Sequence, residues 1–314
     1  MRILVIGGTG FIGQCLVACL VRAGHAIHVP TRRYQSGRDL LVFPPLTLLE
    51  ADVHDDIQLQ RLLSEVDAVI NLVGVLHSRP GMPYGPEFER AHVELPRRIA
   101  AGCRKAGVRR LLHVSALGAD PSGPSAYQRS KAAGEAAVQA EFASFPQGAL
   151  TIFRPSVVFG HDDNFMNLFA RLAKWLPVIP LAGAKARLQP VYVRDVAMAM
   201  TNALDDSATY GKTYPVAGVG QYTLAELVRL AAKWSGRPRP VWPLPWFVGY
   251  AQARMFELLP GEPLMSRDNL DSLRVDNITD VALDGVLGVV PTPLESVAPG
   301  YLRGSRAKRG PVYG

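Results

Sequence analysis

A glycine-rich turn between an apolar strand and a helix constrains the fold of this chain more than any other feature of its sequence. Residues 2–6 form a largely apolar, strand-like run, and Gly7-Gly8-Thr9-Gly10-Phe11-Ile12-Gly13 follows it directly. Residues 11–23 then have helical periodicity, which Gly24 ends. Glycines at this spacing allow a tight turn, a close approach of a pyrophosphate to the backbone, and close packing of the helix on the strand. The segment therefore predicts a dinucleotide site at a helix N-terminus.

Strand-like and helix-like runs alternate through the first half of the chain. Strands are predicted at 26–30, 46–50, 67–73, 108–115 and 149–153. A helix at 87–106 should be kinked or broken by Pro96, and a helix at 125–142 opens with the capping box Ser125-x-x-Gln128. This alternation predicts an α/β protein with a Rossmann-type, doubly wound parallel sheet.

The sequence pattern changes after Arg154. Apolar and proline-rich stretches there interrupt shorter predicted helices, such as those at 195–204 and 224–235. We therefore predict a dinucleotide-binding Rossmann core at 1–155, to which 187–217 returns. Residues 156–300 should form most of a smaller C-terminal lobe for a substrate or partner, placed over the carboxyl edge of the sheet. Residues 301–314 are a basic tail, predicted to be disordered.

Composition excludes several classes of protein. With 48% hydrophobic and 19% charged residues, the chain is neither disordered nor fibrous. Four cations in the tail contribute to the net charge of +7, and the tail is either a solvated end or an attachment to an anionic membrane surface or acidic partner. No aromatic-interleaved basic motif indicates nucleic acid, and the cysteines and histidines lack metal-ligand spacing. No leader or spanning segment is apparent, so we expect a cytoplasmic protein that the tail could bring to the inner face of the membrane.

The end of the second predicted strand indicates which dinucleotide binds. It reads Pro30-Thr31-Arg32-Arg33, and no acidic residue occurs between Gly7 and Asp39. NAD(H) sites usually place a carboxylate here on the ribose 2′-hydroxyl, whereas a guanidinium suits the 2′-phosphate of NADP(H). The sequence therefore favours NADP(H) over NAD(H). The alternative is that these arginines merely cover a loop.

Tyr127 and Lys131 are the candidate catalytic pair. They lie four residues apart on the predicted helix, so they share one face. A nearby ammonium could lower the pKa of the tyrosine toward neutrality, and the tyrosine would then relay a proton to or from a substrate oxygen. Ser115, at the end of the fifth strand, could hold the same oxygen.

With these motifs the chain resembles the extended and atypical short-chain dehydrogenase/reductases. Within that family it is most similar to the nucleotide-binding accessory subunit of respiratory complex I and its bacterial stand-alone relatives. The resemblance rests on Gly7–Gly13, Ala51-Asp52-Val53, Asn71-Leu72-Val73-Gly74, His113-Val114-Ser115, Tyr127-Gln128-Arg129-Ser130-Lys131, 154–160, 189–197 and 263–269.

The resemblance implies a role for each matching residue. Asp52 and Val53 would contact the adenine, Lys131 would hold the nicotinamide ribose while Tyr127 supplies the proton, and Pro155 would lie beside the nicotinamide. The complete set of expected cofactor contacts is Gly7, Thr9, Gly10, Phe11, Ile12, Gly13, Thr31, Arg32, Arg33, Asp52, Val53, Leu72, Val73, Gly74, Lys131 and Pro155.

Two features depart from the family pattern. His92 stands where extended members commonly have Asn, and Pro96 stands near their Gly-Thr. The second departure is that the diphosphate-sugar clamp of the sugar epimerases is not recognisable after Asn164. Both features argue against a sugar-nucleotide substrate.

Three functions remain open from the sequence. The first is an NADP(H)-dependent oxidoreductase of the short-chain type, with Tyr127, Lys131 and Ser115 as its acid–base site and a substrate that could be apolar or quinone-like. The second is a non-catalytic, NADPH-holding accessory or assembly protein of a respiratory membrane complex. The third is an NAD-dependent nucleotide-sugar epimerase or dehydratase. The retained Tyr127, Lys131 and Ser115 favour the first, whereas the closer family match favours the second. The proline- and tryptophan-rich stretch 241–259 suggests an apolar partner, although core packing explains it equally well.

Overall fold

The computed structural model describes residues 1–303 except 262 and 284. Its centre is a seven-stranded sheet in the order β11-β6-β5-β4-β1-β2-β3, and every neighbouring pair in it is parallel. The strands are β1 (Arg2–Ile6), β2 (Ala26–Thr31), β3 (Leu46–Glu50), β4 (Ala68–Asn71), β5 (Arg110–Val114), β6 (Ala149–Pro155) and β11 (Thr213–Val216). The predicted Rossmann-type fold is confirmed.

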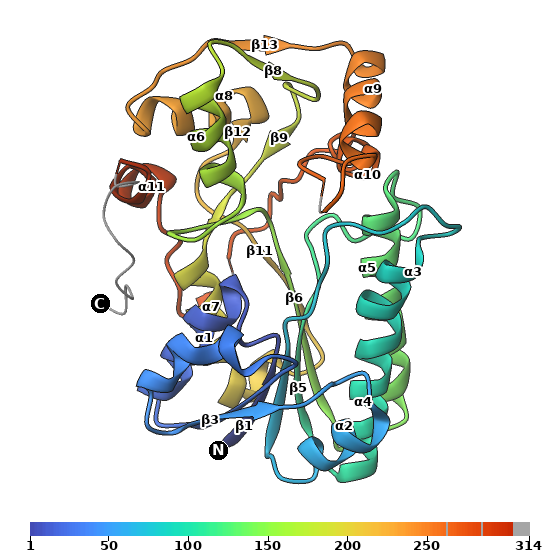
Figure 1. Ribbon diagram of the computed structural model, residues 1–314. Coiled ribbons are helices and arrows are strands. Elements are labelled where there is room, and N and C mark those ends of the chain that lie inside the picture. The colour runs from blue at the N-terminus through green and yellow to red at the C-terminus, as the bar shows by residue number, and fades with distance from the viewer. Residues whose placement is uncertain (262, 284, 304–314) are drawn as a thin grey trace.

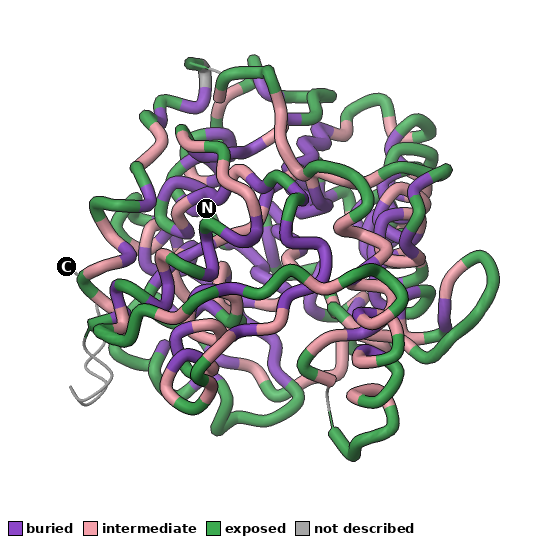
Figure 2. The backbone as a smooth tube through the Cα atoms, turned by 90° about the horizontal axis from the view of Figure 1, so that it is seen from above, coloured by how far each residue is buried: buried purple, intermediate pink, exposed green. Residues whose placement is uncertain are grey.

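Helices cover both faces of this sheet (Figure 1). On one face lie α1 (Phe11–Arg22) and α7 (Val193–Asp205), and on the other α2 (Asp56–Leu63), α4 (Leu95–Ala106) and α5 (Ala126–Ala143). The alternation of side chains along β1 explains the two layers. Ile3 and Val5 join the core under α1 and α7, whereas Leu4 and Ile6 join the core under α2, α4 and α5. Buried backbone accordingly fills the interior of the molecule, with exposed backbone around it (Figure 2).

Pro96 changes the geometry of its helix without ending it. The helical run consists of α3 (Pro86–Phe88), a π-helical segment at Glu89–Glu94 and then α4, with Pro96 in the first turn of α4. Because proline has no N–H and its ring crowds the carbonyl four residues earlier, the preceding turn widens. The predicted kink is therefore a π-helical turn.

Beyond β6 the chain builds a second hydrophobic core. Its helices are α6 (Phe165–Trp175), α8 (Leu224–Trp234) and α11 (Leu294–Leu302), packed around side chains such as Met166, Leu227 and Leu294. Three short strand pairs brace it: β7 (Val158–Phe159) with β10 (Val191–Tyr192), β9 (Arg187–Leu188) with β12 (Tyr222–Thr223), and β8 (Ile179–Leu181) with β13 (Val241–Pro243). Helices α9 (Trp246–Glu257) and α10 (Arg267–Ser272) follow.

The predicted tail begins later than expected. Tyr301 and Leu302 belong to α11, Leu302 is buried, and the Tyr301 hydroxyl donates to Asp163 Oδ2 at 2.6 Å. Residues 304–314, where we predicted disorder, lie outside the described residues.

Arg110 ties the sheet to the end of α7 from inside the core. Its side chain donates to the carbonyls of Leu204, Ala149 and Ala203 at 2.9, 2.9 and 2.6 Å, and the residue is 5% exposed. Burial lowers the pKa of Arg110 to about 10, so the guanidinium stays charged at neutral pH.

Replacing this arginine should destabilise the fold. We expect Arg110→Met to lower the free energy of unfolding by roughly 3 kcal/mol, because it leaves buried carbonyls without a donor. The adjacent Arg109 is exposed, so Arg109→Met should change stability by less than about 0.5 kcal/mol. Urea denaturation of both variants measures this, and equal losses would contradict the assignment.

Candidate functional site

The glycine turn is built as its spacing predicts. Gly7 has φ +86°, in the left-handed region, and a Cβ there would lie 3.2 Å from Leu72. A Cβ on Gly13 would lie 2.4 Å from the Gly7 carbonyl oxygen, so only glycine lets α1 pack this closely. Gly10 is the N-cap of α1 and has no side chain with which to cap the first amides of the helix. The first amides of α1 are therefore open to an anionic ligand.

Thr9, Phe11 and Ile12 complete this turn. The Thr9 carbonyl accepts from Gln14 Nε2 at 3.1 Å, and Ile12 packs against the core under α1 and α7. A Cβ on Gly160, from the segment after β7, would lie 3.1 Å from the ring of Phe11. The glycine turn thus lies next to the segment after β7, which belongs to the second half of the chain.

The ends of β2 and β3 lie next to each other. The Ala51 amide donates to the Thr31 carbonyl at 2.9 Å, which places Asp52 and Val53 beside the exposed Arg32 and Arg33. The Asp52 carboxylate accepts the His54 amide at 2.9 Å, and Arg32 is close enough to contribute to the lowered pKa of His54, whose main cause is burial. The predicted adenosine-side residues therefore come together at one edge.

The ends of β4, β5 and β6 continue the same edge. The Leu72 amide donates to the Ile6 carbonyl at 2.9 Å, and the Val73 amide donates to Asn71 Oδ1 at 3.1 Å. A Cβ on Gly74 would lie 3.7 Å from Lys131 Nζ, so the end of β4 meets α5. Pro155 is buried at the end of β6, and its carbonyl accepts the Leu117 amide at 3.0 Å.

Lys131 reaches from α5 to the end of β5. Its Nζ donates to the Val114 carbonyl at 3.0 Å, one residue before Ser115. Burial lowers the pKa of Lys131 to about 8, although Glu135 opposes this change. Ser115 is 3% exposed, and its hydroxyl has no hydrogen-bond partner among the described residues. A buried hydroxyl without a partner is costly unless a ligand satisfies it.

Tyr127 lies on the same face of α5, but its pKa differs from our prediction. Burial, with a contribution from Asp268, raises the pKa of Tyr127 to about 12, whereas we expected a nearby ammonium to lower it. Burial is the main cause, and the Lys131 ammonium is itself engaged with the Val114 carbonyl. The hydroxyl is therefore protonated at neutral pH.

His92, which sequence reasoning treated only as a departure from the family, is part of the site. Its Nε2 accepts the Val75 amide at 3.0 Å, so its Nδ1 carries the proton and donates to Ser130 Oγ at 2.8 Å. Ser130 in turn donates to the Tyr127 carbonyl at 2.8 Å. Burial lowers the pKa of His92 to about 2, so it is neutral. In the sequence, Pro96 was the residue that could have pointed to His92, because Pro96 widens the helical turn that carries His92.

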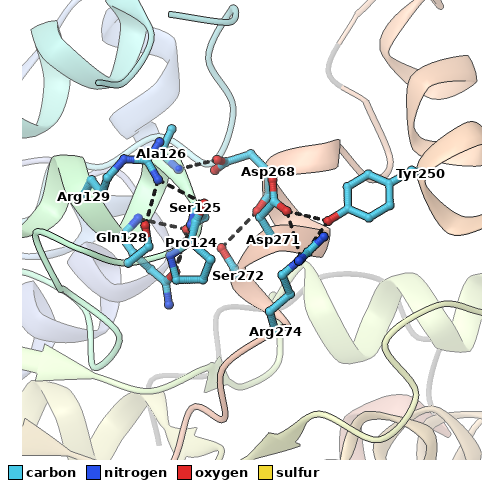
Figure 3. Close-up of polar contacts among 11 residues, drawn as sticks. Pro124, Ser125, Ala126, Gln128, Arg129, Tyr250, Asp268, Asp271, Ser272 and Arg274 are labelled. Atoms are coloured by element: carbon cyan, nitrogen blue, oxygen red, sulfur yellow. Dashed lines mark hydrogen bonds and ion pairs between the residues drawn. The ribbon is translucent and has the colours of Figure 1, made fainter. Parts of the chain in front are cut away.

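Asp268 fixes the start of α5 from the second lobe (Figure 3). Its carboxylate accepts the amides of Ala126 and Tyr127 at 2.6 and 3.1 Å. A carboxylate at a helix N-terminus satisfies open amides and complements the helix dipole. Ser125 and Gln128 form the predicted capping box at the same end. Further along α5, Glu135 binds Arg154 through two hydrogen bonds of 2.8 and 2.5 Å.

The comparisons with known proteins identify the family. Residues 3–217 match the NAD dependent epimerase/dehydratase family, and the chain belongs to it. Mouse mitochondrial NADH dehydrogenase (ubiquinone) 1 alpha subcomplex subunit 9 is 36% identical over 97% of this chain and 80% of its own length. Ceramide reductase of Caulobacter vibrioides is 30% identical, over 76% of this chain and 72% of its own. The predicted resemblance is confirmed.

The solved structures agree on the fold. UDP-glucose 4-epimerase of Thermus thermophilus, in complex with NAD, superimposes with a TM-score of 0.67 at 22% identity, covering 97% of this chain and 100% of its own. The residues of this chain fit such a dinucleotide on their own geometry, through the glycine cradle and the N-terminal amides of α1 that it leaves uncapped by a Gly10 side chain.

The buried ammonium of Lys131 should give a specific pH dependence of stability. Its pKa falls from 10.5 in the unfolded chain to about 8 in the fold. Below pH 8 both states hold the proton and the burial cost is fully present. Between about pH 8 and 10.5 the folded state releases a proton that the unfolded state keeps, so stability rises with pH.

We therefore expect the unfolding free energy of wild type, relative to Lys131→Met, to increase over this window by at most roughly 3 kcal/mol. Urea denaturation at several pH values measures the difference. The exposed Lys105 supplies a control, because Lys105→Met should follow wild type. A constant difference between wild type and Lys131→Met would show that the ammonium is not desolvated.

Proposed function

We propose that this protein is an NADP(H)-dependent oxidoreductase that transfers a hydride between the nicotinamide and a carbonyl or alcohol carbon of an apolar substrate. The observation that carries the proposal is the buried hydroxyl of Ser115, which has no hydrogen-bond partner among the described residues. It lies beside Lys131 at the edge of the sheet where α5, the helix of Tyr127, begins. A substrate oxygen would satisfy that hydroxyl. The relative named ceramide reductase supports a substrate that combines an apolar body with an oxygen function.

Each residue has a distinct part in this proposal. The bound nicotinamide supplies or accepts the hydride. Tyr127 moves the proton at the substrate oxygen, Ser115 donates a hydrogen bond to that oxygen, and Lys131 holds the ribose with its ammonium. Because Tyr127 is protonated at neutral pH, it starts in the form that a carbonyl reduction requires. Neutral His92 and Ser130 orient the backbone of Tyr127 and carry no charge into the site.

A second candidate function comes from the relatives. Subunits of mitochondrial NADH dehydrogenase from mouse, rat and Arabidopsis thaliana are 32–36% identical over at least 97% of this chain. This similarity supports a protein that holds NADPH as a structural ligand and associates with a respiratory complex. The sugar-nucleotide alternative has weaker support, because the epimerase structures lie below 25% identity and show the fold alone.

The cofactor proposal rests on Arg32 and Arg33, which are exposed beside Asp52 at the ends of β2 and β3. We expect NADPH to bind at least roughly tenfold more tightly than NADH, about 1.4 kcal/mol, and Arg32→Ala to remove most of that difference. Arg109→Ala, at the opposite edge of the sheet, should keep it. Isothermal titration with both dinucleotides decides this, and an equal or greater affinity for NADH would refute the choice of NADP(H).

The acid–base proposal predicts a separation of turnover from binding. In an enzyme, Tyr127→Phe should lower kcat by roughly 10²–10⁴ with nearly unchanged NADPH affinity, because the proton takes part only in the chemical step. Lys131→Met should reduce both. Tyr210→Phe, a control at an exposed hydroxyl, should reduce neither. The assay is NADPH oxidation against a panel of long-chain ketones, ceramide-like carbonyls and quinones.

The structural candidate predicts the opposite pattern. NADPH would raise the melting temperature of wild type and of Tyr127→Phe alike, and no member of the panel would be reduced. Gly10→Asp, which places a carboxylate where the pyrophosphate would bind, should abolish that thermal shift. A strong thermal shift without any turnover would therefore exclude the enzyme proposal for the substrate classes in the panel.

A further inference from the structure

Helix α9 presents apolar side chains outward. Its inner side packs Gly249 and Ala253 against Ala182 and Leu270 in a small core. On the outer side, Phe247, Met255 and Leu258 follow a helical spacing and are 75%, 56% and 80% exposed. An outward apolar stripe is the reverse of what a surface helix normally shows, and large apolar side chains exposed on one side of a helix indicate an interaction site.

Three of the four tryptophans of the chain are exposed at the same end of the second lobe. Trp234 is 8% exposed, whereas Trp175, Trp242 and Trp246 are 84%, 67% and 41% exposed. The pairing of β13 with β8 sets Trp242 opposite Pro180, five residues after Trp175, and Trp246 begins α9. Figure 1 shows β8, β13 and the start of α9 together at the end of the lobe far from the Rossmann sheet. We call Trp175, Trp242, Trp246 and the α9 stripe the tryptophan face.

Basic residues outnumber acidic ones in the segments around this end of the lobe. Residues 164–194 and 227–256 contain no Asp or Glu. Their cations include Arg171, Lys174, Lys233, Arg237, Arg239 and Arg254. Arg187 is instead paired with Asp276, and Arg194 interacts electrostatically with Cys15 on α1. Arg237 and Arg254 are exposed, and Arg239 Nε donates to the Ala173 carbonyl at 3.0 Å, which fastens the chain before β13 to the end of α6. Glu257, also on α9, pairs with Arg267, so the face combines apolar side chains with a rim in which cations predominate.

These properties favour one occupant. Tryptophan suits the headgroup level of a bilayer, and a short helix with an apolar side lies in that plane while flanking Lys and Arg attract anionic lipids. No helix among the described residues has the length and hydropathy to cross a bilayer. We propose that the tryptophan face docks on the surface of an anionic phospholipid membrane, with α9 lying in the headgroup region. The proposal is independent of whether the nucleotide site is catalytic.

The test is binding of the full chain to phosphatidylcholine vesicles with and without phosphatidylglycerol. We expect co-sedimentation with the anionic vesicles that salt weakens. We also expect quenching of tryptophan fluorescence by brominated lipid. Phe247→Ser combined with Leu258→Ser should weaken binding roughly tenfold or more. The matched control is Ile57→Ser, because Ile57 is 82% exposed on α2, away from this face.

Several outcomes would overturn the proposal. One is failure of the full chain to bind anionic vesicles, which would point to a protein partner for the face. Another is equal binding by wild type and the double Ser variant. Binding that disappears on removal of residues 304–314 but ignores the double Ser variant would assign the membrane contact to the basic tail. Because a folding defect would also weaken binding, Arg237→Gln with Arg254→Gln provides a second variant. It should lose affinity for anionic vesicles at an unchanged melting temperature, and unchanged affinity would count against the face.

Discussion

All seven strands of the central sheet run parallel, and the rest of the structure depends on that constraint. Parallel strands end at one edge, so segments far apart in the sequence meet there. The strand order reverses between β1 and β4, which is where doubly wound folds form a crevice for a ligand. The glycine turn after β1, the loop after β4 and the ends of β5 and β6 border that crevice. Every residue proposed to touch the dinucleotide lies at or just after the end of a strand, in the first turn of α1, or on α5.

Helix α5 is held in place by both parts of the molecule. From the Rossmann side, Arg154 at the end of β6 binds Glu135, and the Val114 carbonyl receives Lys131. From the second lobe, Asp268 accepts the first amides of the helix. A shift of α10 would therefore move the first residues of α5, which include Tyr127. This gives the second lobe a physical means of affecting the proposed acid–base pair, Tyr127 and Lys131, in addition to any contact with a substrate.

The buried polar groups at the site differ in the free energy of desolvation that their burial costs. His92 and His113 are neutral because burial lowers the pKa of each, to about 2 and about 3, and both are hydrogen-bonded. Lys131 keeps its ammonium with one carbonyl partner, and the Ser115 hydroxyl lacks any partner among the described residues. Buried charges and buried polar groups without a partner are rare in proteins, and they are concentrated at functional sites. Their concentration at the sheet edge is consistent with a site built to receive a polar ligand.

The sequence by itself determined the elements that depend on local patterns. The glycine turn, the alternation of strands and helices, and the Ser125–Gln128 cap follow from backbone geometry and from side-chain period within a few residues, and the structure has them at the predicted places. Tertiary structure decided what depends on burial and on distant partners. It set the raised pKa of Tyr127, the part that His92 plays, the cap from Asp268 and the outward stripe of α9. Those properties arise when segments separated by tens to more than a hundred residues meet, and the free energies of desolvation and charge pairing that result are not encoded in any local pattern.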